Sequence, residues 1–258
     1  MLFRSLHGKY KVPHFDGKGE VDAVFATEAA PTSYLLAAFY WENYIYFGQG
    51  PRRNADGVLQ LSLPLGGQKL PGVAAEDIGV IIGSGMGGLT TLSENIHTLT
   101  EKGPGRVSPF MVPAMITNMA AGQVSMMHGF KGPNFCPTSA CATAAHAIGE
   151  AAEMIRRGVA SIMVAGGSEA TVCEIGVLGF SQARALSTAF NDNPTAASRP
   201  WDKDRDGFVM GEGCGALVLE ELEHAKKRGA KIYAEVSGYG MSGDAYHITS
   251  PAEGHDGA

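Results

Sequence analysis

The residues of this chain with the clearest chemical potential are four cysteines: Cys136, Cys141, Cys173 and Cys214. None forms a Cys-x-x-Cys pair, and the gaps between them fit no zinc-binding pattern. No secretory signal is visible, so we expect reduced thiols rather than disulfides. A free thiol is either a buried structural side chain or, where its pKa is lowered, a nucleophile. The residues around each cysteine indicate which of these roles it has.

Cys141 stands where a turn gives way to a helix. Pro137 disfavours helix just before it, whereas residues 142–157 have a helical pattern that ends in basic residues and Gly158. The helical pattern begins around Cys141, and the unpaired N–H groups and dipole of a helix start favour a thiolate there. The small residues that follow let a substrate approach the sulfur. We therefore predict Cys141 as a nucleophile, and a buried structural cysteine is the alternative.

Apolar segments that alternate with helical patterns surround this cysteine. Short apolar runs between turn residues predict buried strands. These runs are Ile78–Ile82, Ile162–Ala165, Ala216–Leu219 and Ile232–Val236. Glu220–Arg228 is predicted as a charged helix, because its acids precede its bases as the helix dipole prefers, and Gly229 ends it. Strands that alternate with helices imply a largely parallel sheet and an α/β fold.

The composition is that of an ordinary globular chain, with 258 residues, 45 % hydrophobic and 18 % charged residues and a net charge of −6. This diffuse acidic balance gives no reason to expect nucleic acid as a partner. No apolar run reaches transmembrane length, so we expect no membrane insertion. The first fifteen residues are basic but poor in serine, which favours an ordinary terminus and a cytoplasmic protein, with a mitochondrial or plastid matrix as the alternative.

Two further patterns partly match known cofactor-binding and metal-binding motifs. Gly83-x-Gly85-x-x-Gly88 follows a predicted strand, but no acidic residue ends a second strand at the spacing that dinucleotide binding needs. Asp202-x-Asp204-x-Asp206 resembles the start of a calcium loop, but the twelfth position is a glycine, not the required glutamate. We therefore expect neither a bound cofactor nor a metal.

Eight segments, in order from about Asp77 to Pro251, resemble those of β-ketoacyl-acyl-carrier-protein synthases and are closest to the elongating, type II branch. The similar segments are Gly83–Leu89, Val107–Phe110, Thr138–Thr143, Val164–Glu169, Ala183–Thr188, Ser198–Asp202, Asp206–Val209 and Asp244–Pro251. The resemblance implies the N-terminal half of a thiolase-like, layered α/β fold. It also implies an acyltransferase of fatty-acid biosynthesis that is a homodimer when complete.

In this family, acyl-carrier protein passes its acyl chain to the nucleophilic cysteine, here Cys141, and a malonyl-derived carbanion then attacks that thioester in a Claisen condensation. The substrates ride on the phosphopantetheine of the carrier, so no other cofactor is implied. By the same resemblance, Met86 and Phe180 line the acyl pocket, and Arg184 and Thr249 lie near its mouth. Arg184 suits contact with an acidic carrier protein.

The chain departs from the family at both ends. The two histidines and the lysine that catalyse condensation belong to a C-terminal half for which we find no counterpart, so we expect at most slow acyl transfer to Cys141 from this chain alone. The opening strand and glycine turn of the family have no counterpart that we find in residues 1–30. Residues 1–76 are therefore interpreted as a divergent or mis-assembled segment before an N-terminal synthase domain at 77–258. Within them, Arg53–Asp56 weakly echoes a family helix. An inert fragment, a non-catalytic partner, and a thiolase relative that uses coenzyme A remain as alternatives.

Overall fold

The computed structural model describes residues 73–254, together with Arg52–Arg53 and Leu59–Gln60. The described chain forms two compact units that interleave along the sequence. The sheet unit contains 73–87, Val112–Glu169 and 213–254, and the smaller unit contains Gly88–Met111 and Ala170–Glu212. Most of segment 1–76 lies outside the described residues, so its interpretation stays a prediction.

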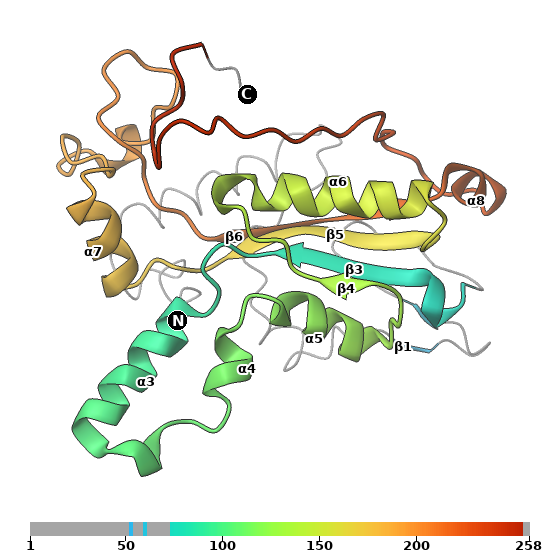
Figure 1. Ribbon diagram of the computed structural model, residues 1–258, viewed down its shortest axis with the longest axis horizontal. Helices are drawn as coiled ribbons and strands as arrows, with labels where there is room; N and C mark the ends of the chain where they lie inside the picture. Colours follow the sequence, from blue (N-terminus) through green and yellow to red (C-terminus); the bar gives the residue numbers. More distant parts are fainter. Residues whose placement is uncertain (1–51, 54–58, 61–72, 255–258) are drawn as a thin grey trace. The chain divides into compact units, whose positions relative to one another are not determined.

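The sheet unit is built on a sheet whose described strands run in the order β4-β3-β5-β6 (Figure 1). Their bounds are β3 Ile78–Gly83, β4 Asn134–Phe135, β5 Ile162–Glu169 and β6 Gly213–Glu220. β3 pairs in parallel with both β4 and β5, while β6 runs antiparallel to β5. The prediction of a largely parallel sheet is thus confirmed. The antiparallel strand is β6, and an apolar run in the sequence does not indicate the direction of its strand.

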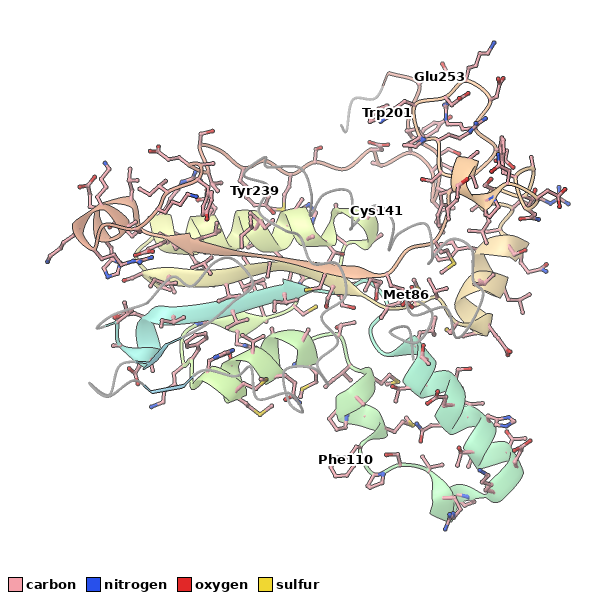
Figure 2. The ribbon with its side chains drawn as sticks, turned by 180° about the vertical axis from the view of Figure 1, so that it is seen from behind. Met86, Phe110, Cys141, Trp201, Tyr239 and Glu253 are labelled. Carbon is pink, nitrogen blue, oxygen red and sulfur yellow. The ribbon has the colours of Figure 1, made fainter. Side chains whose placement is uncertain are left out.

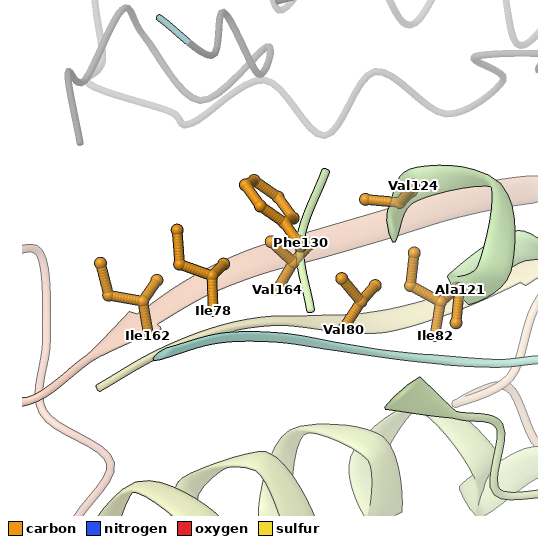
Figure 3. Packing of buried hydrophobic residues seen from close by; sticks show 8 residues of the cluster. All are labelled: Ile78, Val80, Ile82, Ala121, Val124, Phe130, Ile162 and Val164. Carbon is orange, nitrogen blue, oxygen red and sulfur yellow. The ribbon is translucent and has the colours of Figure 1, made fainter. Parts of the chain in front are cut away.

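Helices cover both faces of this sheet: α5 (Met119–His128) lies on one and α6 (Thr143–Arg156) on the other (Figure 1). Ile78, Val80 and Ile82 point toward α5, where they pack with Ala121 and Val124 (Figure 3). The intervening Ile81 packs on the opposite face, with Met163 of β5 and Ala147 and Ala151 of α6. This alternation explains why β3 reads as a continuous apolar run, since every residue of the strand is buried on one face or the other.

Short helices connect these elements in the sheet unit. They are η2 (Ala75–Asp77), α4 (Met111–Met115), η4 (Ala140–Ala142) and α8 (Leu222–Lys227). α8 begins two residues later than predicted, because Glu220 still belongs to β6. Glu221 then caps the helix, and its carboxylate accepts the backbone N–H groups of Glu223 and His224.

The smaller unit consists of helices and long loops. Its elements are α3 (Leu89–Lys102), η3 (Pro104–Arg106), α7 (Glu174–Gln182) and η5 (Pro194–Ala196). After α7, Leu186 forms an isolated bridge with Phe208. Phe208 also packs its ring edge-on against Phe180 of α7, with 5.1 Å between the ring centroids. These contacts fix the loop that follows α7.

One expectation about secondary structure is wrong. Ile232–Val236 is not a strand: residues 230–250 contain neither helix nor strand, and Ile232 and Tyr233 are exposed. A strand needs a neighbour for its hydrogen-bond ladder, and none of the described strands pairs with this segment. Of the segment Arg53–Asp56, which weakly echoes a family helix, the structure describes only Arg53; it belongs to β1 (Arg52–Arg53), which pairs antiparallel with β2 (Leu59–Gln60).

None of the helices in the described part of the chain is both long enough and apolar enough to cross a membrane.

Candidate active site

Cys141 is exposed and lies in η4, the single 3-10 turn directly before α6. The helix thus begins at Thr143, slightly later than the sequence predicts, and the thiol sits in the turn that leads into it (Figure 2). The preceding Ala140 has φ 51°, in the left-handed region that costs a non-glycine residue about 1–2 kcal/mol. Backbone strain of this kind persists only where surrounding contacts hold it, and it clusters at functional sites.

Two side-chain contacts hold this strained turn against α6. The buried Thr143 hydroxyl accepts the Ser139 backbone N–H at 2.8 Å. The Ser139 hydroxyl lies 2.6 Å from Nδ1 of His146, one turn further along the helix. Both contacts join residues on either side of Cys141. They hold the turn in place, and neither of them involves the Cys141 sulfur. Sequence reasoning did not identify Ser139, whose partner becomes apparent only from the helix geometry.

Met86 is brought close to the same turn. It lies in the glycine turn after β3, and that turn is bonded to the loop before Cys141 at two points. The Ser84 N–H donates to Cys136 Sγ at 3.3 Å, and the Thr138 hydroxyl donates to the Ser84 carbonyl at 2.9 Å. The Met86 side chain is 41 % exposed. Figure 2 shows Met86 and Cys141 at the same end of the sheet.

The other three cysteines have different surroundings. Cys136 is half-buried, and its sulfur both accepts the Ser84 N–H and contacts the Pro137 carbonyl. Cys214 lies in β6, where burial raises the pKa of its thiol. Cys173 is half-buried directly before α7. All four cysteines lie in the described part of the chain, and of these only Cys141 is exposed.

Thr249 belongs to the sheet unit, in a segment that runs back along α6. The Arg156 guanidinium donates to the Val236 carbonyl, and further along the segment the Tyr239 ring packs over Gly149. The chain therefore runs antiparallel to α6, toward the end that carries Cys141. Thr249 itself is exposed, and its N–H donates to Nδ1 of His247 at 3.2 Å.

Phe180 and Arg184 belong to the smaller unit. Phe180 is half-buried in α7 against Phe208, and Arg184 is exposed just beyond the end of that helix. Arg184 has φ 55° and donates its N–H to the Ser181 carbonyl, so it ends the helix in the position that glycine usually takes. Arg184 therefore presents an exposed positive charge on this unit.

Asp206, from the calcium-like run, also lies in the smaller unit and is engaged by its own chain. Its carboxylate accepts the Ser187 hydroxyl at 2.6 Å and the N–H groups of Thr188 and Ala189, each at 2.8 Å. The Ser187 bond, followed by the two backbone bonds, lowers the pKa of Asp206 to about 2. These bonds tie residues 187–189 to the loop that carries Asp206.

Glu169 is the charged residue near the site that sequence reasoning missed. Its carboxylate accepts the N–H groups of Gly85 and Met86 in the glycine turn. The N–H groups that would hold a phosphate in a dinucleotide-binding turn are thus bonded to the protein's own carboxylate. The signal was present in the sequence, as an acid at the end of the strand that neighbours the glycine turn.

Comparison with known proteins identifies this arrangement. Residues 66–225 match the family model described as "Beta-ketoacyl synthase, N-terminal domain". The 3-oxoacyl-[acyl-carrier-protein] synthase 2 of Rhizobium meliloti is 59 % identical over 180 residues, which cover 70 % of this chain and 43 % of the relative. The synthase 2 of Vibrio cholerae is 49 % identical over 263 residues, which cover 99 % of this chain and 61 % of the relative. The mitochondrial synthase of Arabidopsis thaliana is 57 % identical over 183 residues, 71 % of this chain and 40 % of that protein.

Solved structures of ketosynthases also resemble this chain. A type II PKS acyl-carrier protein in complex with its ketosynthase bound to the hexaketide superposes with a TM-score of 0.67 at 36 % identity, covering 70 % of this chain and 45 % of that one. A β-ketoacyl synthase from Burkholderia phymatum gives 0.66 at 38 % identity, covering 73 % and 46 %. The predicted α/β, thiolase-like fold is thereby confirmed. The chain spans roughly half the length of the relatives it matches, and it belongs to the β-ketoacyl synthase family, whose N-terminal domain its residues 66–225 form.

Proposed function

We propose that this chain supplies the acyl-accepting site of a β-ketoacyl-acyl-carrier-protein synthase of fatty-acid elongation. The observation that carries the proposal is the exposed Cys141 thiol, held in a strained turn at the start of α6. The names of the relatives, 3-oxoacyl-[acyl-carrier-protein] synthases, support the reaction class. Retention of the cysteine argues against an evolved non-catalytic partner.

In the first step, the Cys141 thiolate attacks the thioester carbonyl of an acyl-carrier protein. The bond from that carbonyl to the carrier's sulfur breaks, and the carrier leaves as a thiol after taking up a proton. The negative charge on the tetrahedral intermediate needs a hydrogen-bond donor. The Cys141 backbone N–H suits this role, because it makes no backbone hydrogen bond within the described residues.

In the second step, malonyl-carrier protein loses carbon dioxide, and the resulting carbanion attacks the acyl-Cys141 carbonyl. A carbon–carbon bond forms, the bond to sulfur breaks, and the Cys141 thiolate is restored. The family uses two histidines and a lysine of its C-terminal half here. His146 is not a substitute in our account, since its Nδ1 is engaged by Ser139.

The remaining residues are assigned to substrate binding. Met86 and Phe180 line the acyl pocket, while Arg184 and Thr249 lie at its mouth. Arg184, exposed and cationic, suits the acidic surface of a carrier protein. The complete enzyme is a homodimer in this proposal and acts in the cytoplasm or in an organelle matrix.

The test compares three proteins: the 258-residue chain, a chimera that adds the C-terminal part of the Vibrio cholerae relative, and the same chimera with Cys141→Ala. With acyl- and malonyl-carrier protein, the chimera should form β-ketoacyl product, whereas the Cys141→Ala variant and the chain alone should not. Product from the Cys141→Ala chimera at an undiminished rate would refute the proposal. Acyl-coenzyme A as a matched donor tests the thiolase-type alternative, which predicts that it outperforms the carrier.

A further inference from the structure

Glu169 makes a concentrated set of contacts with the turn that carries Met86. It is the last residue of β5, and that turn follows β3, the parallel neighbour of β5. Its carboxylate accepts the Gly85 N–H at 2.7 Å, the Met86 N–H at 3.1 Å and the Ser84 hydroxyl at 3.1 Å. The Ser84 hydroxyl accepts the Gly87 N–H at 3.0 Å in turn. A single side chain thus organises the whole turn.

The glycines of this turn make the contact possible. A Cβ on Gly85 would lie 2.7 Å from Oε2 of Glu169, so only glycine lets the carboxylate come this close. Gly87 has φ +67°, which a side chain would strain. Successive N–H groups that converge on one point form an anion-binding nest, and hydrogen bonds to a charged acceptor are stronger than neutral ones.

The partners of the Glu169 carboxylate lie in the turn itself. Among the described residues, no lysine, arginine or histidine forms an ion pair with this carboxylate. Its stabilisation therefore comes from the N–H groups and the hydroxyl of the turn. Conversely, the position of the turn depends on the carboxylate.

We propose that Glu169 is a positioning residue that fixes Met86 at the wall of the acyl pocket and so sets the preference for acyl-chain length. The inference rests on the proposed function, in which Met86 lines that pocket. Glu169 binds the backbone of Met86 and leaves its side chain 41 % exposed beside the loop of Cys141. The binding of a long acyl chain that reaches Met86 depends on this placement, whereas the binding of a short chain that does not reach Met86 does not.

The test uses Glu169→Gln in the chimera described above. Glutamine keeps the shape but loses the charge and turns an amide donor toward the N–H groups of the nest. The ratio of kcat/KM for a long acyl chain to that for a short one should fall about ten-fold, the effect of losing one charge-assisted hydrogen bond. The fall should appear as a higher KM for the long chain.

Three further variants separate positioning from general damage to the fold. In a Met86→Ala background, Glu169→Gln should no longer change the ratio, because the side chain that it positions is gone. Ser84→Ala, which removes only the bridging hydroxyl, should shift the ratio in the same direction by about three-fold. Glu94→Gln, an exposed carboxylate on α3, is the matched control and should change nothing.

The outcomes distinguish this inference from the function on which it rests. If the unmutated chimera forms no acyl-Cys141, the proposed function fails. If it acylates normally, but Glu169→Gln leaves the long-to-short ratio unchanged or changes it equally in the Met86→Ala background, the positioning role alone is overturned. A ratio that falls in the single variant and stays constant in the double variant supports it.

Discussion

At the scale of single residues, the site consists of one reactive thiol and several neighbouring residues that fix the backbone around it. Ala140 holds a left-handed backbone conformation directly before Cys141, and Ser139 is bonded to both Thr143 and His146 just beyond it. The thiol is therefore presented outward by a turn that cannot relax without breaking these hydrogen bonds. Cys141 differs from the other three cysteines in its exposure to solvent.

The first prediction concerns thiol reactivity. Brief iodoacetamide treatment of the folded chain should alkylate Cys141 well before the other cysteines, because it is the exposed thiol. Cys214 should be slowest, since burial raises its pKa and so lowers its thiolate fraction. Peptide mass spectrometry gives the order of labelling, and labelling in denaturant is the control. Faster modification of Cys136, Cys173 or Cys214 in the folded chain would rule out the assignment.

The second prediction concerns the pocket wall. Met86→Phe in the chimera should impair long acyl chains more than short ones, because added bulk at the proposed pocket wall takes space from the end of a long chain, and overpacking costs about 1–3 kcal/mol. Steady-state kinetics over a series of chain lengths measures this, and Met86→Leu is the volume-conserving control. An equal loss at all chain lengths would count against the placement of Met86.

At the scale of elements, the parts that the sequence predicts well are those with a local signal. The buried strands β3 and β5 appear as apolar runs, and α6 has both helical periodicity and a clear end. Ile232–Val236 has the same apolar character, yet it forms no strand, because pairing depends on a partner that local sequence does not specify. Cys141 and Met86 were found through family-like motifs, whereas Glu169 acts through a contact 84 residues away from Gly85.

The third prediction tests how the segment after α8 docks on α6. A Cβ on Gly149 would lie 2.1 Å from the Tyr239 ring. Gly149→Ala alone should therefore loosen this segment and raise hydrogen exchange around residues 236–240, although alanine favours helix over glycine by about 1 kcal/mol. Adding Tyr239→Ala should reverse the sign of the effect on α6 and leave only the helix-stabilising gain. Protection of 236–240 that is unchanged by Gly149→Ala would mean that the segment does not pack there.

At the scale of the whole molecule, one buried histidine ties stability to pH. His128 ends α5, is only 5 % exposed, and stacks on Phe130 with 5.2 Å between ring centroids. Its Nδ1 has no hydrogen-bond partner among the described residues. Burial without a compensating partner lowers the pKa of His128 from 6.5 to about 4.

The fourth prediction follows from the sign of that shift. The unfolded chain binds the proton first as pH falls, so stability due to neutral His128 is complete above about pH 6.5 and is lost as pH falls toward 4. The full loss corresponds to about 3 kcal/mol. Urea unfolding between pH 7 and 4.5 should show this slope, and His128→Leu should flatten it. The exposed His97→Gln on α3 is the control, and equal slopes in all three proteins would contradict the prediction.

Cys141 is the acyl acceptor in the proposed function, and the mass of the acylated protein measures that role. The chimera is incubated with an acyl-carrier protein but no malonyl donor, and its peptides are then mapped by mass spectrometry. We predict a mass gain equal to one acyl group on the peptide that contains Cys141, removable by neutral hydroxylamine as a thioester is, and absent in Cys141→Ala. An acyl group on any other residue, or the same gain in the Cys141→Ala protein, would show that Cys141 is not the acyl acceptor.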